Sequence, residues 1–543
     1  MLLPGRGVDV LQLDRLRITE GAGRDPKKMC LNGTRVSVLE RVHTWIHGGG
    51  HGANARLLLA IGQAGVGKSA IAHSIANEYA EMGRLGATFC FSKDRGSAHV
   101  FRTIARNLAD VDPVYASVLS SSTISSEMAT TTSLEIQFKL LLLVPFQRLS
   151  VIGPVVIVLD ALDECVDRNA FVDCLIDNID SLPDNVRILM TSRPTEAYRL
   201  REQPWVTVMN FEDEPPNNKD ILLYVQDRLN AQRLGSAKLH GLTERDLRDI
   251  SSHSEGLFQY ASVVCSEILS SYFYEWSSGE PETPKQTFLR LVKDRKGGLD
   301  ELYSGLLEKL YPSAKANSQG LKDFQRVMGW ILAAQHRLTH RALVEFGNLL
   351  HGSDFDDLGG YNRVSMTLRP LGALLSGTQE GSTVVYPLHS SIRNYLTDKE
   401  RSGRFYIGSE NEQHHSLASI SLQLLVAPGR LRFNIAGLES SYLYNKDVSD
   451  FEARVSTAIS ASLSYSCRYW ATHLRLSLKS PAEFEGLEDI STLVNQKFLF
   501  WLEVLGLLGK TSVAEDACQM LILGLTVRPE STFLSHSGTD IHC

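Results

Sequence analysis

The chain has 543 residues, of which 43% are hydrophobic, and a formal net charge of −7 at pH 7. This length predicts about three or four domains of roughly 100–200 residues each. The mildly acidic charge, without any block of like charges, argues against a nucleic-acid-binding protein that relies on a basic surface.

The cysteines and the N-terminal residues narrow the possible classes of protein further. The eight cysteines show neither CxxC spacing nor Cys/His clustering, so we expect neither a disulfide framework nor a zinc site. The N-terminal residues lack the pattern of a signal peptide, and no run approaches the ~20 apolar residues of a bilayer span. We therefore expect a cytoplasmic chain without a membrane span.

The first 29 residues are predicted to form a loose tail, because Gly21, Gly23 and Pro26 interrupt any periodicity. A helical pattern follows from Gly33 to His47, and a flexible glycine-rich stretch succeeds it at residues 48–52.

The most informative motif is GQAGVGKS at residues 62–69. It lies between an apolar run at 57–61 and a helix-prone run from Ser69, so the strand, glycine loop and helix of a P-loop are all present. In a P-loop the backbone N–H groups face phosphate oxygens at the helix N-terminus, Lys68 adds an ammonium group, and Ser69 offers a hydroxyl to Mg²⁺. The alternative is a glycine-rich turn that only joins strand to helix. The predicted nucleotide-binding residues are Gly62, Gly65, Val66, Gly67, Lys68, Ser69 and Ala70.

Further short apolar runs follow the P-loop at residues 87–91, 155–159, 186–190 and 206–209. Strand-like runs that alternate with helix-capable segments predict a parallel sheet with helices on both faces, the α/β fold of P-loop NTPases. Residues 134–149 predict an apolar core helix, with a kink at Pro145.

A P-loop needs an acid at the end of a neighbouring strand to position Mg²⁺. The apolar run at 155–159 ends in Asp160, and Asp163 and Glu164 follow closely. We predict Asp160 as the Mg²⁺ residue and Asp163 or Glu164 as the base that orients water. The alternative is that Asp163 and Glu164 only cap the next helix.

A second polar cluster follows the next apolar run, where Thr191 and Ser192 precede Arg193. A neighbouring strand would deliver this guanidinium to the γ-phosphate, so Arg193 is predicted to sense which nucleotide is bound. The alternative is that Arg193 pairs with a surface carboxylate.

Beyond residues 215–216 the strand pattern stops and the chain becomes mainly helical. Two helices within 324–350, a hairpin arm at 382–386 and a helix from Ser391 suggest a winged helix. Residues 410–525 are predicted to be helical, and 526–543 to form a second tail.

Together these motifs resemble the NACHT class of signal-transduction NTPases, on the segments LDALDEC at 159–165 and MTSRP at 190–194. The segments CLNGTR, EGLFQYAS, LHSSIRNYL and CRYWATHL, which begin at residues 30, 255, 388 and 467, are similar to landmarks of the fungal members. The resemblance implies a nucleotide-binding domain, a helical lid and a winged helix that closes on ADP. It also implies an effector domain before the NTPase and repeats after it, so the chain would be a short adaptor form or part of a larger architecture.

The resemblance also assigns residues. It gives Lys68, Ser69, Asp160 and Arg193 the roles already inferred, and it makes His389 a contact to ADP in the resting state. Thr34 and Arg35 are implied to line the adenine side. One departure is Phe258, which stands where related plant and animal switches often have a proline.

We therefore expect six regions along the chain. They are a tail at 1–29, the nucleotide-binding domain at 30–210, a helical lid at 211–300, a winged-helix-like domain at 301–408, a C-terminal helical domain at 409–525 and a tail at 526–543.

The leading functional hypothesis is a molecular switch that is closed with ADP and opens when ADP is exchanged for ATP or GTP. The open form then self-associates or binds protein partners. The switch would use Mg²⁺ and hydrolyse the nucleotide slowly. Family habit places such switches in innate-immunity-like or cell-death-like pathways. The alternatives are a continuously cycling NTPase and a helical scaffold with a vestigial nucleotide site.

Overall fold

The structure is a computed structural model. It describes residues 21–48, 55–92, 96–121, 131, 133–147, 153–165, 167–194, 198–214, 217–230, 241–273, 282–293, 298–312, 319–351, 363–379, 381, 383–440, 442–477 and 487–526. The chain divides into two compact units, residues 1–299 and residues 300–543.

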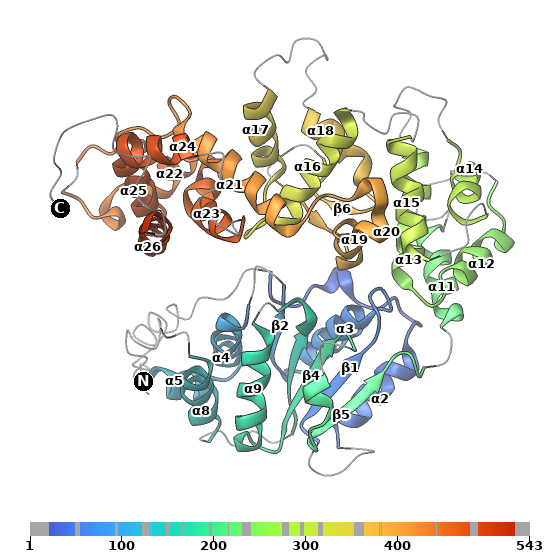
Figure 1. Ribbon diagram of the computed structural model, residues 1–543. Helices are drawn as coiled ribbons and strands as arrows, with labels where there is room; N and C mark the ends of the chain where they lie inside the picture. The colour runs from blue at the N-terminus through green and yellow to red at the C-terminus, as the bar shows by residue number, and fades with distance from the viewer. Residues whose placement is uncertain are drawn as a thin grey trace. The chain divides into compact units, whose positions relative to one another are not determined.

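A five-stranded parallel sheet forms the centre of the first unit (Figure 1). Its strand order is β2-β3-β4-β1-β5. The strands are β1 (Leu57–Ile61), β2 (Leu85–Cys90), β3 (Val155–Asp160), β4 (Val186–Ser192) and β5 (Val206–Asn210). Every residue of β1 and β3 is buried, as continuous apolar runs in a sheet covered on both faces should be. The predicted parallel sheet is confirmed.

Helices cover both faces of this sheet. Along β1, Leu57, Leu59 and Ile61 join one hydrophobic cluster, whereas Leu58 and Ala60 join the other, because successive side chains of a strand point to opposite faces. Helices α4 (Val100–Val111), α5 (Pro113–Ser121) and α9 (Arg168–Asn178) contribute to the first cluster, and α2 (Val36–Ile46) and α3 (Lys68–Glu81) to the second.

The predicted core helix at 134–149 is not uniformly α-helical. It consists of α7 (Leu134–Gln137), a π-helical segment (Phe138–Leu143) and α8 (Val144–Phe146). Leu143 keeps right-handed helical backbone angles, so Pro145 lies inside one continuous helical run, and the π-helical turns lie directly before the proline that lacks an N–H.

Part of the segment that we expected as an N-terminal tail is attached to the sheet. Ala22 is fully buried, and its carbonyl accepts a hydrogen bond from the Cys90 N–H at 2.8 Å. A short 3₁₀ turn then spans Pro26–Lys28. The rest of the first unit is helical, with α10 (Tyr198–Arg201), α11 (Asn218–Arg228), α12 (Glu244–His253), α13 (Phe258–Phe273), α14 (Pro284–Phe288) and a π-helical turn (Leu289–Lys293).

The second unit is mainly helical. The second unit begins within α15 (Leu299–Leu310). Its other helices are α16 (Gln319–Ala333), α17 (His340–His351), α18 (Arg363–Leu368), α19 (Ser390–Leu396), α20 (Lys399–Ser402), α21 (Glu410–Val426), α22 (Phe451–Ala458), α23 (Ala461–Ser477), α24 (Leu487–Thr492), α25 (Phe498–Leu507) and α26 (Ser512–Thr526). A small antiparallel pair joins β6 (Leu375–Ser376) to β7 (Tyr386–Pro387).

Helices α21 and α23 form a core that contains a buried polar chain. His414 Nδ1 lies 2.8 Å from His473 Nδ1, and His473 Nε2 lies 2.7 Å from the Tyr465 hydroxyl, which accepts the Gln335 N–H at 3.1 Å. Burial, with a smaller effect from His414, lowers the pKa of His473 to about 3. His473 is therefore a neutral ring at neutral pH.

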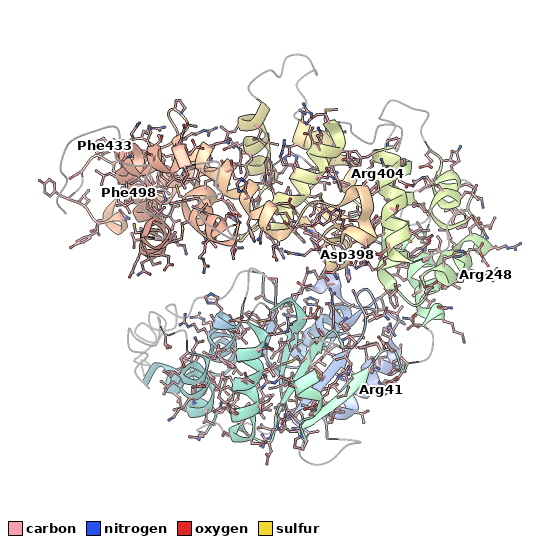
Figure 2. The ribbon with its side chains drawn as sticks, viewed as in Figure 1. Arg41, Arg248, Asp398, Arg404, Phe433 and Phe498 are labelled. Atoms are coloured by element: carbon pink, nitrogen blue, oxygen red, sulfur yellow. The ribbon has the colours of Figure 1, made fainter. Side chains whose placement is uncertain are left out.

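The loop between α21 and α22 exposes aromatic side chains. Phe433 is 79% exposed (Figure 2), and Tyr442 and Tyr444 are also exposed. The Glu503 carboxylate accepts the backbone N–H groups of residues 434 and 435, each at 3.1 Å, so part of this loop is held from α25. Among the described residues, no helix combines the length and the apolarity that crossing a membrane requires.

Candidate functional site

The glycine loop connects the carboxyl end of β1 to the first turn of α3. Gly65 and Gly67 have φ angles of 91° and 98°, a region that residues with a side chain rarely occupy. At Gly62 a β-carbon would lie 2.9 Å from the Phe211 Cβ. Each glycine is therefore required by the local geometry, and the loop directs its backbone to the N-terminus of α3, as phosphate binding needs.

Lys68, the first residue of α3, folds back over this loop. Its Nζ donates to the carbonyls of Gly62 and Gln63 at 2.7 and 2.8 Å. Burial lowers the pKa of Lys68, and the neighbouring Asp163 carboxylate opposes that shift. The ammonium group thus lies close enough to the acid cluster to interact with it. Ser69 is exposed in the same turn.

Asp160 ends β3 and is 4% exposed. The Thr191 hydroxyl on the neighbouring strand β4 donates to Asp160 Oδ1 at 2.5 Å and accepts the Ala161 N–H at 2.8 Å. Ala161 has left-handed backbone angles, φ 62° and ψ 49°, which explains why a small residue follows the aspartate. Thr191 therefore orients the predicted Mg²⁺ residue, a role that we had not assigned from the sequence.

Asp163 and Arg193 meet at the same edge of the sheet. The Arg193 Nε lies 2.8 Å from Asp163 Oδ2, and the two side chains are 27% and 9% exposed. The partner of Arg193 is thus a mostly buried carboxylate of the predicted site. Asp163 and Glu164 lie in a 3₁₀ turn, and the N-cap residue of the next helix is Asp167, so neither acid caps α9.

A second group of donor atoms surrounds Asp160. One ring nitrogen of His73, the Cys90 Sγ and an Asp160 carboxylate oxygen lie within 4.8 Å of one another. Cys90 and Asp160 are partners in the register of β2 and β3. Because they are far apart in the sequence, we did not predict that they lie together. His73 Nδ1 accepts the Asp25 N–H at 3.1 Å, and burial lowers the pKa of this histidine.

Arg35 joins the glycine loop to the helices that follow the sheet. Its Nη2 donates to the Val66 carbonyl at 2.6 Å, and its backbone N–H donates to Asp220 Oδ2 at 2.8 Å. The guanidinium lies over the rings of Phe211 and Phe258, 5.4 and 5.2 Å from their centroids. Burial lowers the pKa of Arg35. Phe258, the departure from proline noted in the sequence, therefore packs on this arginine.

Two further contacts extend this connection. The Gln259 N–H in the first turn of α13 donates to the Gly65 carbonyl at 3.2 Å. Thr34 is buried and donates to the Leu31 carbonyl at 2.7 Å, which shapes the turn before Arg35. The loop and the start of α13 are thus directly connected within the first unit.

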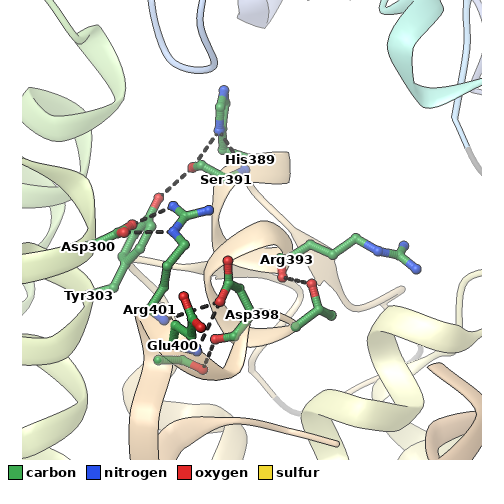
Figure 3. A network of polar contacts seen from close by, with 10 residues as sticks. Asp300, Tyr303, His389, Ser391, Arg393, Asp398, Glu400 and Arg401 are labelled. Carbon is green, nitrogen blue, oxygen red and sulfur yellow. Dashed lines mark hydrogen bonds and ion pairs between the residues drawn. The ribbon is translucent and has the colours of Figure 1, made fainter. Parts of the chain in front are cut away.

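His389 lies in the second unit, where it is the N-cap residue of α19 (Figure 3). Its Nδ1 accepts the Ser391 N–H at 3.1 Å and lies 2.7 Å from the Ser391 hydroxyl. The contact to ADP that the resemblance implies for His389 stays a prediction.

The donors at the sheet edge suit a Mg²⁺ nucleotide. Asp160 and Ser69 offer oxygen ligands, which Mg²⁺ prefers. Cys90 and His73 offer softer donors that suit zinc better. The glycine loop, whose Gly62 leaves no room for a β-carbon, offers backbone N–H groups to phosphates.

Two comparisons with known proteins agree with this geometry. A family model described as Nephrocystin 3, N-terminal, matches residues 33–193. This span starts beside Arg35 and ends at Arg193, so it contains the glycine loop and the acid strand.

The second match is the vegetative incompatibility protein HET-E-1 of Podospora anserina, which is 23% identical over 394 residues. The alignment covers 68% of this chain and 27% of that protein, so the chain spans about a quarter of the length of the curated relative that it matches. Together the two matches confirm the resemblance to fungal NACHT-type signalling proteins.

Proposed function

Proceeding from this resemblance, we propose that the chain is a nucleotide-dependent signalling switch. ADP holds the closed state, and exchange for ATP opens the chain and exposes a surface that self-associates. Residues 211–300 act as the lid, 301–408 as a winged-helix-like domain and 409–525 as a helical domain. The switch works through different binding energies in two states and not through fast turnover.

The observation that carries this proposal is the convergence of four charged side chains at the carboxyl ends of β1, β3 and β4. Lys68, Asp160, Asp163 and Arg193 come from three separate stretches of sequence, and the Asp163–Arg193 pair has a separation of 2.8 Å. In open α/β sheets, ligands bind beyond the carboxyl ends of the strands.

Each residue has a role in this proposal. Backbone N–H groups of the glycine loop and Lys68 hold the phosphates, and Ser69 and Asp160 hold Mg²⁺. Mg²⁺, when bound, neutralises charge on the phosphate oxygens. Arg193 senses the γ-phosphate, and Asp163 or Glu164 orients water.

The contacts between the glycine loop and α13 can couple the state of the bound nucleotide to the conformation of the helices that follow the sheet. Arg35 bonds to the Val66 carbonyl, and Gln259 bonds to the Gly65 carbonyl. A loop that rearranges around phosphates must therefore adjust the contacts of α11 and α13. The nucleotide in the loop thereby biases the position of the helical segment, as a switch requires.

The Asp163–Arg193 pair also supports slow hydrolysis. A carboxylate that is held by a guanidinium is not available as a base until Arg193 moves. We therefore infer that hydrolysis follows the rearrangement of Arg193 and resets the switch.

The name of the matched fungal protein indicates the cellular pathway that we propose. HET-E-1 is by its name a vegetative incompatibility protein, so we propose that this chain acts in a self/non-self or cell-death-like response of a fungal cell. A cytoplasmic location is part of the same proposal, since the adenine nucleotides that it would read are there.

The proposal is tested by measuring the mass of the full chain by light scattering after loading with ADP, or with ATP and Mg²⁺. We expect a small species with ADP and a larger one with ATP, and no response in a variant with Lys68→Ala. Equal masses with both nucleotides would contradict the switch. Multiple turnover at a rate that does not depend on assembly would favour the cycling enzyme.

A further inference from the structure

Three side chains that can bind a metal ion converge where α3 packs on β2 and β3. A ring nitrogen of His73 on α3, the Cys90 Sγ at the end of β2 and a carboxylate oxygen of Asp160 at the end of β3 lie within 4.8 Å of one another. His73 is 3% exposed, and Asp160 is 4% exposed. The sequence gave no indication of this group, because its members come from three separate elements.

The geometry and the charge of this group fit a zinc-class ion. In a tetrahedral zinc site with the usual bond lengths, donor atoms lie about 3.4–3.6 Å apart, so small side-chain movements bring the three donors to one ion. A thiolate, a carboxylate and a neutral imidazole carry two negative charges, which a divalent cation balances in a buried place. Thiolate and imidazole donors favour zinc over Mg²⁺, and three protein ligands leave a fourth position for water.

Two of these side chains also hold residues 23–25. The Cys90 thiol donates to the Gly23 carbonyl at 3.8 Å, and His73 Nδ1 accepts the Asp25 N–H at 3.1 Å. Both contacts depend on the positions of protons, because the thiol needs its proton to donate and Nδ1 must lack one to accept. Metal binding changes both conditions.

The consequence for Asp25 is the same whichever ring nitrogen of His73 binds the ion. If Nδ1 binds it, the lone pair that accepts the Asp25 N–H is used. If Nε2 binds it, the single proton of the neutral ring must be on Nδ1, which then cannot accept. At Cys90 the ion takes the thiolate, so the thiol proton passes to solvent and the contact to the Gly23 carbonyl is lost.

We propose that His73, Cys90 and Asp160 form a binding site for zinc or a similar divalent transition metal, and that filling this site breaks the contacts of His73 and Cys90 to residues 23–25. The Ala22 carbonyl keeps its backbone bond to Cys90, so the segment is loosened locally and stays attached at that point. The site needs no nucleotide and goes beyond the proposed function. It shares Asp160 with the Mg²⁺ role given there, so zinc competes with that role.

Cobalt(II) is the probe for this site, because it replaces zinc and a cobalt–thiolate bond absorbs in the near ultraviolet. The full chain, freed of nucleotide and Mg²⁺, is titrated with Co²⁺, and Zn²⁺ is then added to displace the cobalt. The unaltered chain should show this absorption, and Cys90→Ser should lose it. Asp160→Asn and His73→Gln should each weaken binding by about 100-fold or more, since even the loss of a partner outside the ligands costs about 10–100-fold.

Cys30→Ser is the matched control, at another partly exposed cysteine of the first unit, and it should keep both the absorption and the affinity. Absorption that persists in Cys90→Ser, or that the unaltered chain never shows, would refute the site. A measurement on the unaltered chain covers the case in which a variant fails to fold. Zinc should slow the reaction of Cys90 with a maleimide several-fold, as followed by mass mapping, and an unchanged rate would also refute the site.

Hydrogen exchange tests the loosening of residues 23–25. Zinc, at a concentration that saturates only chains with an intact site, should raise the exchange rate of the Asp25 amide several-fold in the unaltered chain and in Cys30→Ser, but not in Cys90→Ser. Zinc binding with an unchanged Asp25 rate would overturn the proposal. Because no nucleotide takes part in these measurements, the proposed function can fail while this site stands, and the reverse.

Discussion

Two regions of the chain bury polar groups, and they do so in opposite ways. At the carboxyl edge of the sheet the polar groups are charged: Asp160 is buried, and Lys68, Asp163 and Arg193 are partly buried beside it. In the core of α21 and α23 the buried groups are rings that contact one another, and burial keeps His473 neutral. Burying charge is costly without a partner or a ligand, so we take the first arrangement as the proposed binding site and the second as part of a structural core.

The largest effect should come from the charged edge. Lys68→Ala removes the ammonium group that we place on the phosphates, and we expect nucleotide retention to fall by about 100-fold or more, since a charged group in a phosphate site contributes several kcal/mol. Filter retention of labelled ADP measures this. Lys219→Ala, at an exposed lysine of the same unit, is the matched control, and equal retention by both variants would refute the phosphate role.

The second-largest effect should come from the hydrogen bond that orients Asp160. Thr191→Val removes the hydroxyl that bridges Asp160 and the Ala161 N–H, which should destabilise the first unit by about 1–3 kcal/mol. Chemical denaturation measures the change. Thr88→Val is the control, because the Thr88 hydroxyl is buried on the same sheet without a hydrogen-bond partner, and its removal should be neutral or stabilising. The reverse order would show that Thr191 does not orient the carboxylate.

The stability of the second unit should depend on pH, because it contains the buried His473. The pKa of His473 is lowered from 6.5 to about 3 on folding, so the unfolded chain binds the proton more readily. The contribution of His473 to stability is complete above pH 6.5 and is lost as the pH falls toward 3, by up to about 1.4 kcal/mol per pH unit.

Unfolding of the second unit between pH 7 and pH 5 measures this slope. His473→Gln should flatten it, whereas His336→Gln, at an exposed histidine, should leave it as it is. A slope that survives in His473→Gln would place the acid sensitivity elsewhere.

The smallest expected effect concerns Ala161. Ala161→Gly relieves the left-handed backbone angles and should stabilise the first unit by roughly 0.5 kcal/mol, the net of relieved strain and greater freedom of the unfolded chain. Ala80→Gly, inside α3, should instead destabilise by about 1 kcal/mol. Thermal unfolding of the two variants distinguishes these signs, and destabilisation by both would remove the conformational explanation of a small residue after Asp160.

The same contrast explains what the sequence predicts well. The strands are continuous apolar runs, and the charged groups sit directly after them, so strand ends alone place Asp160 and Arg193 at one edge. The prediction of the parallel sheet needed nothing beyond these short-range patterns. The acid after β3 and the arginine after β4 meet because β3 and β4 are neighbours.

Features that depend on register or on long-range packing were not predicted. Thr191 was noted only as a hydroxyl residue, and its bond to Asp160 depends on the pairing of two strands. The approach of His73 to Cys90 depends on α3 covering β2 and β3. Residues 22–28 include a glycine and a proline typical of a loop, yet the Ala22 carbonyl accepts the Cys90 N–H of the edge strand β2 and the Asp25 N–H donates to His73.

The most direct test of the central claim is to purify the full chain, denature it and identify any released nucleotide by chromatography. The proposed switch predicts about one ADP per chain, held at the glycine loop and absent from Lys68→Ala. A chain that releases no nucleotide and does not bind added ATP or GTP with Mg²⁺ would contradict the account and leave a helical scaffold with a vestigial site.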